Sequence, residues 1–208
     1  MESIKFLIFE KKVKDQVSRD LLFITGFAVG FAFLLLGGKE FFAVKAFESI
    51  GFFVLGCTGI AYSFLSFYSL SEKEKLNGNF TGYLIFSKSI ISVGDKGYDL
   101  KDVLKMEFFV DDYDGLKHGY LGYSPIPKVS NGVENSIRLK MNDGTEEKFN
   151  FQLNYENEFQ KKMRDLLISY HIQDKISFLT LIQYIGISDN YEQIQELKKE
   201  LERLRRFV

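Results

Sequence analysis

Apolar and polar positions divide this chain of 208 residues into regions with different periodicities. The segment 21–71 contains two long apolar runs, residues 21–38 and 49–71, and neither run contains a charged residue. Their lengths, 18 and 23 residues by subtraction, match the roughly 20 residues with which a helix crosses a hydrocarbon core. The pattern predicts a transmembrane α-hairpin over 21–71. The alternative is that both runs are buried helices of a soluble protein.

Small residues recur within both apolar runs at a spacing of four. Gly26 and Gly30 form a G-x-x-x-G pair in the first run, and Gly59 and Ser63 have the same separation in the second. Small side chains at this spacing leave a flat strip on which a second helix can pack closely. We expect these strips to pack within the hairpin or between copies of the chain.

The segment 1–20 precedes the hairpin and is rich in cations near its end. Five cations lie on this side of the first run (Lys5, Lys11, Lys12, Lys14 and Arg19), whereas the link between the runs holds two. Lysine and arginine accumulate on the cytoplasmic side of a membrane. The sequence therefore predicts a multi-pass protein with both termini in the cytoplasm. Residues 1–20 are expected to form a short interfacial helix or a frayed tail.

The pattern changes to that of strands after residue 76. Short runs rich in Ile, Tyr and Phe predict strands over 82–86, 89–93 and 104–110, a turn over 94–97 and a further short strand over 117–121. Alternating residues on either side of Asp143-Gly144 predict a tight hairpin. An amphipathic helix follows, with Asn154 as its expected N-cap. Its apolar stripe consists of Tyr155, Phe159, Met163, Leu166 and Tyr170. Residues 76–171 are therefore expected to form an α+β antiparallel-sheet module covered by one helix.

The C-terminal extension, residues 172–208, predicts a pair of helices. Asp174 is the expected cap of an apolar helix, and Asp189 with Glu192 resembles a capping box before a second one. Apolar residues of the second helix follow a 3-4-3-4 spacing: Ile194, Leu197, Leu201, Leu204 and Val208. This spacing predicts either a short coiled-coil seam between copies of the chain or a stripe that packs on its own chain.

Charge and chemistry narrow the function classes. Residues 72–208 contain 20 Lys and Arg against 22 Asp and Glu, so the basic excess typical of nucleic-acid binding is absent from this region. The single cysteine, Cys57, lies within the second apolar run and has no partner for a disulfide or a two-cysteine zinc site.

His118 with Asp111, Asp112 and Asp114 forms the chain's single acidic cluster with a histidine, which a solvated hairpin end explains best. We expect no enzyme activity, no cofactor and no metal site.

One irregular segment suits recognition of a partner. Aromatic and proline side chains gather at Tyr120, Tyr123, Pro125, Ile126 and Pro127 within a stretch that is otherwise predicted to be loop over 124–132. Exposed loops with such residues often contact peptides or protein surfaces. The alternative is that this loop folds back over an open end of the sheet.

Several of these segments resemble the bacterial pleckstrin-homology-like domain that follows a two-span membrane anchor, as in YcxB-like proteins. The resemblance rests on GYLIFSKSIISV, on Tyr98-Asp-Leu-Lys-Asp-Val103, on the Asp143-Gly144 hairpin and on the helix after Asn154. It implies a non-catalytic binding or scaffolding module at the cytoplasmic face of the bacterial inner membrane, with a lipid, peptide or protein as ligand. The loop over 116–134 and the C-terminal extension depart from the family's layout. A second hypothesis is a small oligomeric membrane effector or channel-like assembly with a cytoplasmic sensor domain.

Overall fold

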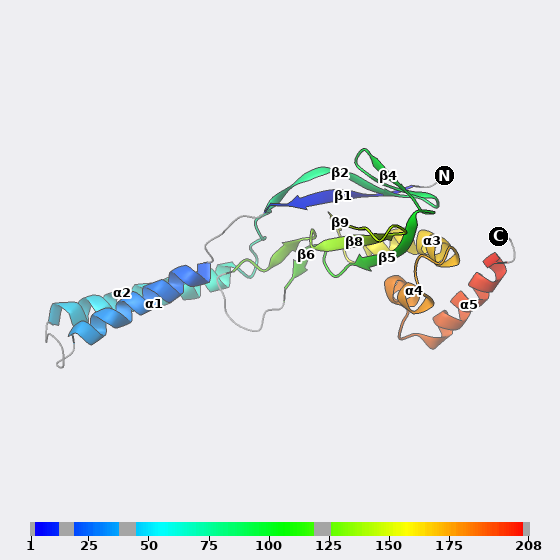
Figure 1. Cartoon of the computed structure of the whole chain (residues 1–208). Helices are drawn as coiled ribbons and strands as arrows, with labels where there is room; N and C mark the ends of the chain where they lie inside the picture. Colours follow the sequence, from blue (N-terminus) through cyan, green and yellow to red (C-terminus); the bar gives the residue numbers. More distant parts are fainter. Residues whose placement is uncertain (1–2, 13–18, 38–44, 119–125, 206–208) are drawn as a thin grey trace. The chain divides into compact units, whose positions relative to one another are not determined.

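The structure, a computed structural model, describes residues 3–12, 19–37, 45–118 and 126–205 (Figure 1). The chain forms two compact units, and each is made of segments that are far apart in the sequence. The first, the sheet unit, comprises Met1–Lys12, Leu76–Leu116 and Asn131–Val208. The second, the hairpin unit, comprises Val13–Lys75 and Lys117–Ser130.

A seven-stranded antiparallel sheet forms the centre of the sheet unit. Its strand order is β4-β3-β2-β1-β9-β8-β5. The strands are β1 (Ile4–Lys11), β2 (Gly78–Phe86), β3 (Ile90–Val93), β4 (Lys96–Asp99), β5 (Val103–Phe109), β8 (Asn135–Met141) and β9 (Glu146–Phe151). Two further short strands, β6 (Asp114–Lys117) and β7 (Val129–Asn131), form a separate two-stranded sheet.

The first strand corrects the prediction for residues 1–20. Ile4–Lys11 is neither an interfacial helix nor a frayed tail, because it pairs with β2 along its full length, from Ile4 opposite Phe86 to Lys11 opposite Gly78. It also meets β9 through Ile8 and Phe151. The strand lies in the middle of the sheet, so the whole helical hairpin is inserted between two paired neighbouring strands.

The sheet is strongly curved. Phe86 of β2 and Phe108 of β5 lie four strand positions apart in the sheet order, which corresponds to about 19 Å in a flat sheet. Their ring centroids nevertheless lie 5.8 Å apart. The sheet therefore folds over so that its two halves face each other, and Figure 1 shows β1 and β2 above β8 and β5.

Helix α3 (Glu158–Ile172) covers the open side of this curved sheet. Phe159 is fully buried, and its ring lies 5.0 Å from that of Phe108 and 6.4 Å from those of Phe6 and Phe151. Met163, Leu166 and Tyr170 of the predicted stripe are also buried, whereas Tyr155 precedes the helix and is exposed. The core of the sheet unit thus forms between the two halves of one sheet and one helix.

Turns and helix ends differ in detail from the sequence prediction. The β8–β9 hairpin turns over Asn142–Gly144, where Gly144 has φ +88 and permits a three-residue loop in place of the expected tight pair. Residues 96–97, predicted as part of a turn, belong to β4, which extends from Lys96 to Asp99. Of the predicted strand over 117–121, Lys117 is the last residue of β6, His118 is not in a strand, and residues 119–121 lie outside the described residues. Strand β7 occupies part of the predicted loop over 124–132.

The expected helix caps are also displaced. Helix α3 begins at Glu158 and not near Asn154, whose backbone N–H instead donates to the Glu158 carboxylate. In α4 (Phe178–Ile185) the cap is Ser177, which accepts from Thr180 N–H, and not Asp174. Helix α5 (Tyr191–Arg205) begins after Asn190, whose side chain accepts from Gln193 N–H, so the capping box at Asp189 is wrong.

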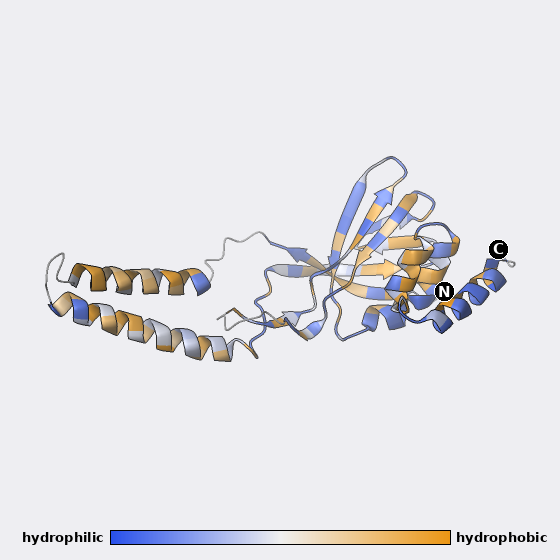
Figure 2. Cartoon of the chain, turned by 90° about the horizontal axis from the view of Figure 1, so that it is seen from below, coloured by the Kyte–Doolittle hydropathy of each residue, from blue (hydrophilic) through white to orange (hydrophobic). Residues whose placement is uncertain are grey.

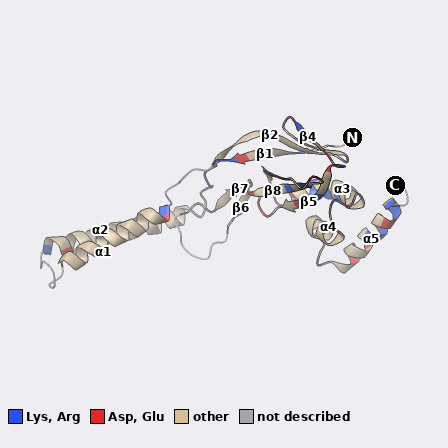
Figure 3. Ribbon diagram, viewed as in Figure 1, with Lys and Arg blue, Asp and Glu red and all other residues tan. Residues whose placement is uncertain are grey.

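The hairpin unit contains the two long apolar helices α1 (Arg19–Gly37) and α2 (Lys45–Tyr68). Both are long and apolar enough to cross a membrane. Only 11% of the residues in the most apolar 18-residue stretch of each helix are buried. Figure 2 shows hydrophobic residues along both helices, and Figure 3 shows their charged residues confined to the helix ends. A helix in the core of a soluble protein would be largely covered, so these two apolar helices are exposed elements that could cross a membrane.

Candidate functional site

The two helices of the hairpin approach each other at glycines. A Cβ atom added at Gly26 would lie 3.0 Å from Thr58 Oγ1, and one at Gly30 would lie 2.8 Å from the Leu55 side chain. Near the other end of α1, a Cβ at Gly37 would lie 2.6 Å from the backbone nitrogen of Glu48. The Gly26–Gly30 strip is therefore in contact with α2 of the same chain, one of the two packing arrangements that the sequence left open.

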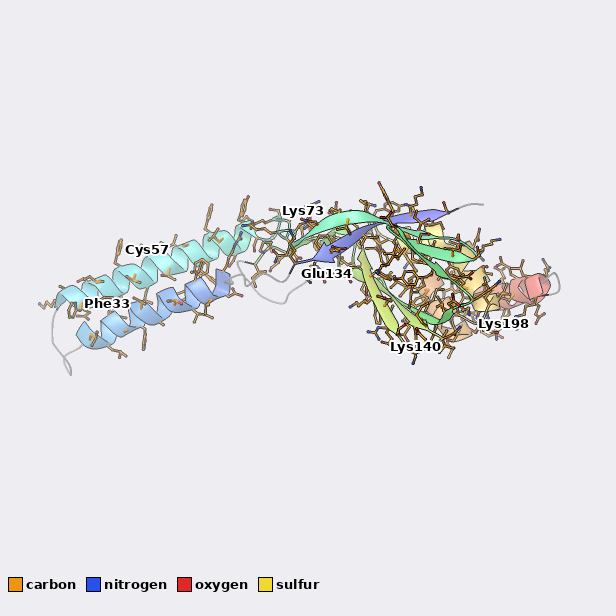
Figure 4. The ribbon with its side chains drawn as sticks, turned by 45° about the horizontal axis from the view of Figure 1, so that its top comes forward. Phe33, Cys57, Lys73, Glu134, Lys140 and Lys198 are labelled. Atoms are coloured by element: carbon orange, nitrogen blue, oxygen red, sulfur yellow. The ribbon has the colours of Figure 1, made fainter. Side chains whose placement is uncertain are left out.

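The second small-residue strip lies on a different face. A Cβ at Gly59 would meet no described atom within 4 Å, and Ser63 is exposed with its hydroxyl donating to Gly59 O at 2.9 Å. The structure does not bring Gly26 and Gly30 together with Gly59 and Ser63. Cys57 also lies exposed on α2, where Figure 4 labels it.

An ion pair joins the beginning of α1 to the segment after α2. The Arg19 guanidinium donates to both carboxylate oxygens of Glu72, at 2.6 and 2.7 Å. Hydrogen bonding to Arg19 lowers the pKa of Glu72. Bidentate pairing of this kind is directional and stronger than a neutral hydrogen bond. The contact closes the hairpin on the side where both connections to the sheet unit begin.

The predicted recognition loop lies mostly outside the described residues. Of its five positions, Tyr120, Tyr123 and Pro125 are not described, while Ile126 is 40% exposed and Pro127 is half-buried. The segment that follows is held in place, since Lys128 N–H donates to Ser69 O at 3.1 Å. The loop stays a prediction as a recognition element.

Members of the predicted acidic cluster make separate contacts. Asp112 is buried and its carboxylate accepts from Glu134 N–H at 3.0 Å, so it holds a chain segment in place. His118 lies 3.8 Å from Glu74 in the hairpin unit. Among the described residues no group of three His, Cys, Asp or Glu side chains could hold a metal ion.

A groove runs along the outer edge of β5, beside α4. It encloses about 430 Å³ and is lined mainly by residues 105–111 together with Ser177, Thr180, Gln183 and Tyr184. The edge is partly occupied: Met106 N–H donates to Lys175 O at 3.0 Å, and Phe108 N–H donates to the Tyr184 hydroxyl at 2.7 Å. Burial raises the pKa of Tyr184. The C-terminal extension therefore covers an edge strand that could otherwise pair with another chain.

Sequence reasoning did not predict this role of Tyr184, because the hydroxyl meets a backbone group 76 residues earlier in the chain. A tyrosine on an otherwise apolar helix was the available signal, since a buried tyrosine hydroxyl usually finds a partner.

The predicted seam of α5 is split between buried and exposed positions. Leu197 and Leu201 are buried in the core of the sheet unit, and Ile194 packs against that core. Leu204 is 38% exposed, and Val208 lies outside the described residues. The Arg164 guanidinium of α3 donates to both carboxylate oxygens of Glu200, at 3.4 and 2.7 Å, and holds α5 in place. These contacts favour packing within the chain over a seam between chains.

No family model, curated protein or solved structure matches the chain. What the structure defines is a class: two exposed apolar helices in a hairpin, a seven-stranded antiparallel sheet and C-terminal helices.

Proposed function

We propose that this chain is a membrane-anchored, non-catalytic binding protein that presents a pleckstrin-homology-like module at the cytoplasmic face of a bacterial inner membrane. The observation that carries the proposal is the exposure of large apolar side chains along α1 and α2. Phe53, Ile60, Phe64 and Phe67 are each more than 70% exposed. Transfer of each such side chain from water to hydrocarbon is favourable by roughly 1.5–3 kcal/mol of free energy, so the hairpin favours a hydrocarbon environment.

The helix lengths agree with this placement. Helix α1 has 19 residues and spans about 28 Å at 1.5 Å per residue, close to the roughly 30 Å of a bilayer core. Helix α2 has 24 residues and spans about 36 Å, which a tilt accommodates. Arg19 and Glu72 would then lie at one membrane surface.

The distribution of cations supports a cytoplasmic sheet unit. Lys11 ends the strand that leads to α1 and Lys12 follows it, and Lys73 and Lys75 follow α2. The link between the two apolar runs, residues 39–48, contains two lysines. Positive charge near both connections to the sheet unit supports a cytoplasmic position for them.

The strand order supports the module's assignment. Strands β1 to β4 are neighbours in sequence order, and β5, β8 and β9 join them where β9 pairs with β1. Helix α3 covers the open side of the sheet. This arrangement agrees with the pleckstrin-homology-like layout. The polar groups that reach the core also suit a binding module more than a catalyst. Tyr170, Tyr184 and Asp112 are each used to hydrogen-bond the backbone, and so serve the fold.

Membrane extraction and cysteine labelling test the proposal. The full chain should stay in the membrane after alkaline carbonate washing, because its helices are embedded. In a Cys57→Ala background, a cysteine at Lys39 in the link should react with a membrane-impermeant thiol reagent added to spheroplasts. A cysteine at the exposed Ser188 should react only after the cells are lysed. Release by carbonate would overturn the anchor, and the reverse labelling pattern would overturn the orientation.

A further inference from the structure

A large cavity in the sheet unit is lined by lysines from three separate segments. It encloses about 910 Å³, which is within the range of small-molecule sites. The segments are the beginning of β1, the turn between β2 and β3, and the first half of α3. The lining residues are Ser3, Ile4, Lys5, Lys88, Lys161, Lys162, Asp165 and Leu166.

The charges that line this cavity are mostly not neutralised. Within the described parts of the chain, neither Lys5 nor Lys88 has an acidic partner within 4 Å. Lys161 lies over the Tyr155 ring at 5.8 Å, whereas Lys162 is paired with the buried carboxylate of Glu158. The formal charge of the lining is +3, four lysines against one aspartate, on a chain whose net charge is −1.

The single acid contributes little to the lining. Asp165 is 88% exposed at its side chain and lies 3.7 Å from the Arg164 guanidinium, so solvent and a neighbouring cation screen it. The cavity therefore presents a positive field that an anion would neutralise.

The three segments are locked to one another, so the lysines do not depend on a loose surface. The Tyr170 hydroxyl donates to Ser87 O at 2.8 Å, and the Gln173 side chain donates to Lys88 O at 3.1 Å. These bonds attach α3 to the turn that carries Lys88. Strand pairing places Lys5 opposite Ile85 of β2, next to that turn. A binding site whose groups are held before the ligand arrives loses less entropy on binding.

The lining also has an apolar component. Ile4 is half-buried and Leu166 is buried, and both line the cavity beside the lysines. A ligand that fits must therefore combine several negative charges with an apolar body. Lysine ammonium groups act as point charges that suit phosphate oxygens in many orientations.

We propose that this cavity binds an organic molecule that carries clustered phosphate groups next to an apolar or aromatic body. The proposal rests on the proposed function only in that the module binds a ligand, and it names the site and the ligand class. The phosphates could belong to a free molecule or to a lipid headgroup. Lys5 and Lys88 supply the two unpaired ammonium groups, and Ile4 with Leu166 contacts the apolar body.

Isothermal titration of the full chain in uncharged detergent tests the site. Adenosine triphosphate without divalent metal serves as the probe with an apolar body, inorganic tripolyphosphate as the probe without one, and citrate as the carboxylate probe. We expect adenosine triphosphate to bind more tightly than tripolyphosphate, and citrate to bind weakest. Equal affinity for citrate and adenosine triphosphate, or no heat with any probe, would overturn the proposal.

Two double variants with the same loss of charge separate a built site from general attraction. Lys5→Gln with Lys88→Gln should weaken adenosine triphosphate binding about tenfold or more, since two charge-assisted contacts are lost. Lys96→Gln with Lys140→Gln removes two exposed lysines outside the lining and should change the affinity by less than twofold. All four lysines are exposed, so unchanged thermal unfolding is expected for both variants. Equal weakening by both pairs would overturn the site.

Vesicles identify the source of the phosphate. If phosphatidic acid in otherwise neutral vesicles displaces adenosine triphosphate, the phosphate belongs to a lipid headgroup. If these vesicles do not displace it, the ligand is a free molecule. Either result agrees with a ligand that carries phosphate groups. Carbonate extraction of the same variants keeps the two proposals apart. Lost phosphate binding with a stable membrane anchor overturns the site alone, and release from the membrane with intact binding overturns the anchor alone.

Discussion

Tyr184 connects the C-terminal helices to the sheet through a single hydroxyl group. Its oxygen accepts the Phe108 N–H at the outer edge of β5, in a largely buried position. The ring also contacts those of Phe108 and Phe159, at 5.4 and 6.3 Å. Removal of the hydroxyl leaves the ring contacts but also leaves a buried backbone donor without a partner.

We predict that Tyr184→Phe lowers the free energy of unfolding by about 1–2 kcal/mol, the cost of an unsatisfied buried donor. Hydrogen exchange at the Phe108 amide should accelerate, because its acceptor is lost. Thermal unfolding and amide exchange of the full chain in detergent measure both effects. Tyr191→Phe is the matched control, since Tyr191 is 74% exposed, and its stability should match wild type. Unchanged exchange at Phe108 would contradict the assigned role.

The Arg19–Glu72 pair gives the hairpin a defined response to acid. Because the pKa of Glu72 is lowered in the folded chain, the contribution of the pair is complete above the ordinary carboxyl value of about 4.3. It is lost as the pH falls through the lowered value. We predict that Glu72→Gln is about 1 kcal/mol less stable than wild type at pH 7, and that this gap is smaller at pH 3.

Thermal unfolding of both proteins at the two pH values measures the gap, and the other carboxylates cancel in the difference. Glu10→Gln removes an exposed carboxylate and should show no such pH-dependent gap. A gap of the same size at pH 3 and pH 7 would show that the carboxylate charge of Glu72 does not stabilise the hairpin.

At the scale of elements, the hairpin depends on close approach between α1 and α2. Gly37 allows the nearest approach, because an added Cβ would meet backbone atoms of Glu48, which cannot move aside as a side-chain end can. We predict that Gly37→Ala destabilises the helix pair by about 1–3 kcal/mol. Gly56→Ala adds the same methyl group where no described atom lies within 4 Å, and should cost nothing. Thermal unfolding in detergent compares the two, and equal stability would contradict this packing.

Elements with a strong local pattern were predictable from the sequence. The two apolar helices follow from the length of their runs, and α3 follows from its stripe of Phe159, Met163 and Leu166. The β8–β9 hairpin follows from Asp143-Gly144, although its loop has three residues. In each case the residues that decide the structure lie within one continuous segment of the chain.

Elements decided by distant partners were not predictable. The apolar residues of β1 form a short run beside cations, and such a run fits a strand or an interfacial helix equally well. It forms a strand because it pairs with β2, whose partner residues lie 67 to 82 positions later in the chain. The β5 groove and the lysine-lined cavity likewise join segments that local periodicity cannot relate. For α5, the sequence predicted the apolar stripe but not whether it packs within the chain or on a second copy. The burial of Leu197 and Leu201 in the core of the sheet unit favours packing within the chain.

At the scale of the whole molecule, the residues that follow the hairpin do not contain the complete sheet unit, because residues 1–12 also belong to it. The segment 76–208 was predicted as a module and an extension, yet it lacks β1. Phe6, Ile8 and Phe9 of that strand are at most 5% exposed. At roughly 2 kcal/mol for each side chain, their loss equals much of the 5–15 kcal/mol that stabilises a typical domain.

We predict that residues 76–208 alone show no cooperative thermal unfolding. Residues 1–12 joined to 76–208 through a short glycine-serine linker should restore a cooperative transition, because Lys12 N–H donates to Asn77 O and the two ends already meet. Circular dichroism during heating measures the transition. As a control, the same joined chain with Phe6→Asp should not fold, since it places a charge in the core. Cooperative unfolding of 76–208 alone would contradict the central role of β1.

The insertion of the hairpin between β1 and β2 also sets an order of events during synthesis. A ribosome releases β1 first, then both apolar helices, and only afterwards the strands on either side of β1 in the finished sheet. Until then Phe6, Ile8 and Phe9 have no place to be buried, and such exposed strands are prone to aggregate. Insertion of the helices into the bilayer would hold β1 and β2 side by side at one surface. Under the proposed membrane anchor, maturation of the sheet would therefore be coupled to delivery of the nascent chain to the membrane.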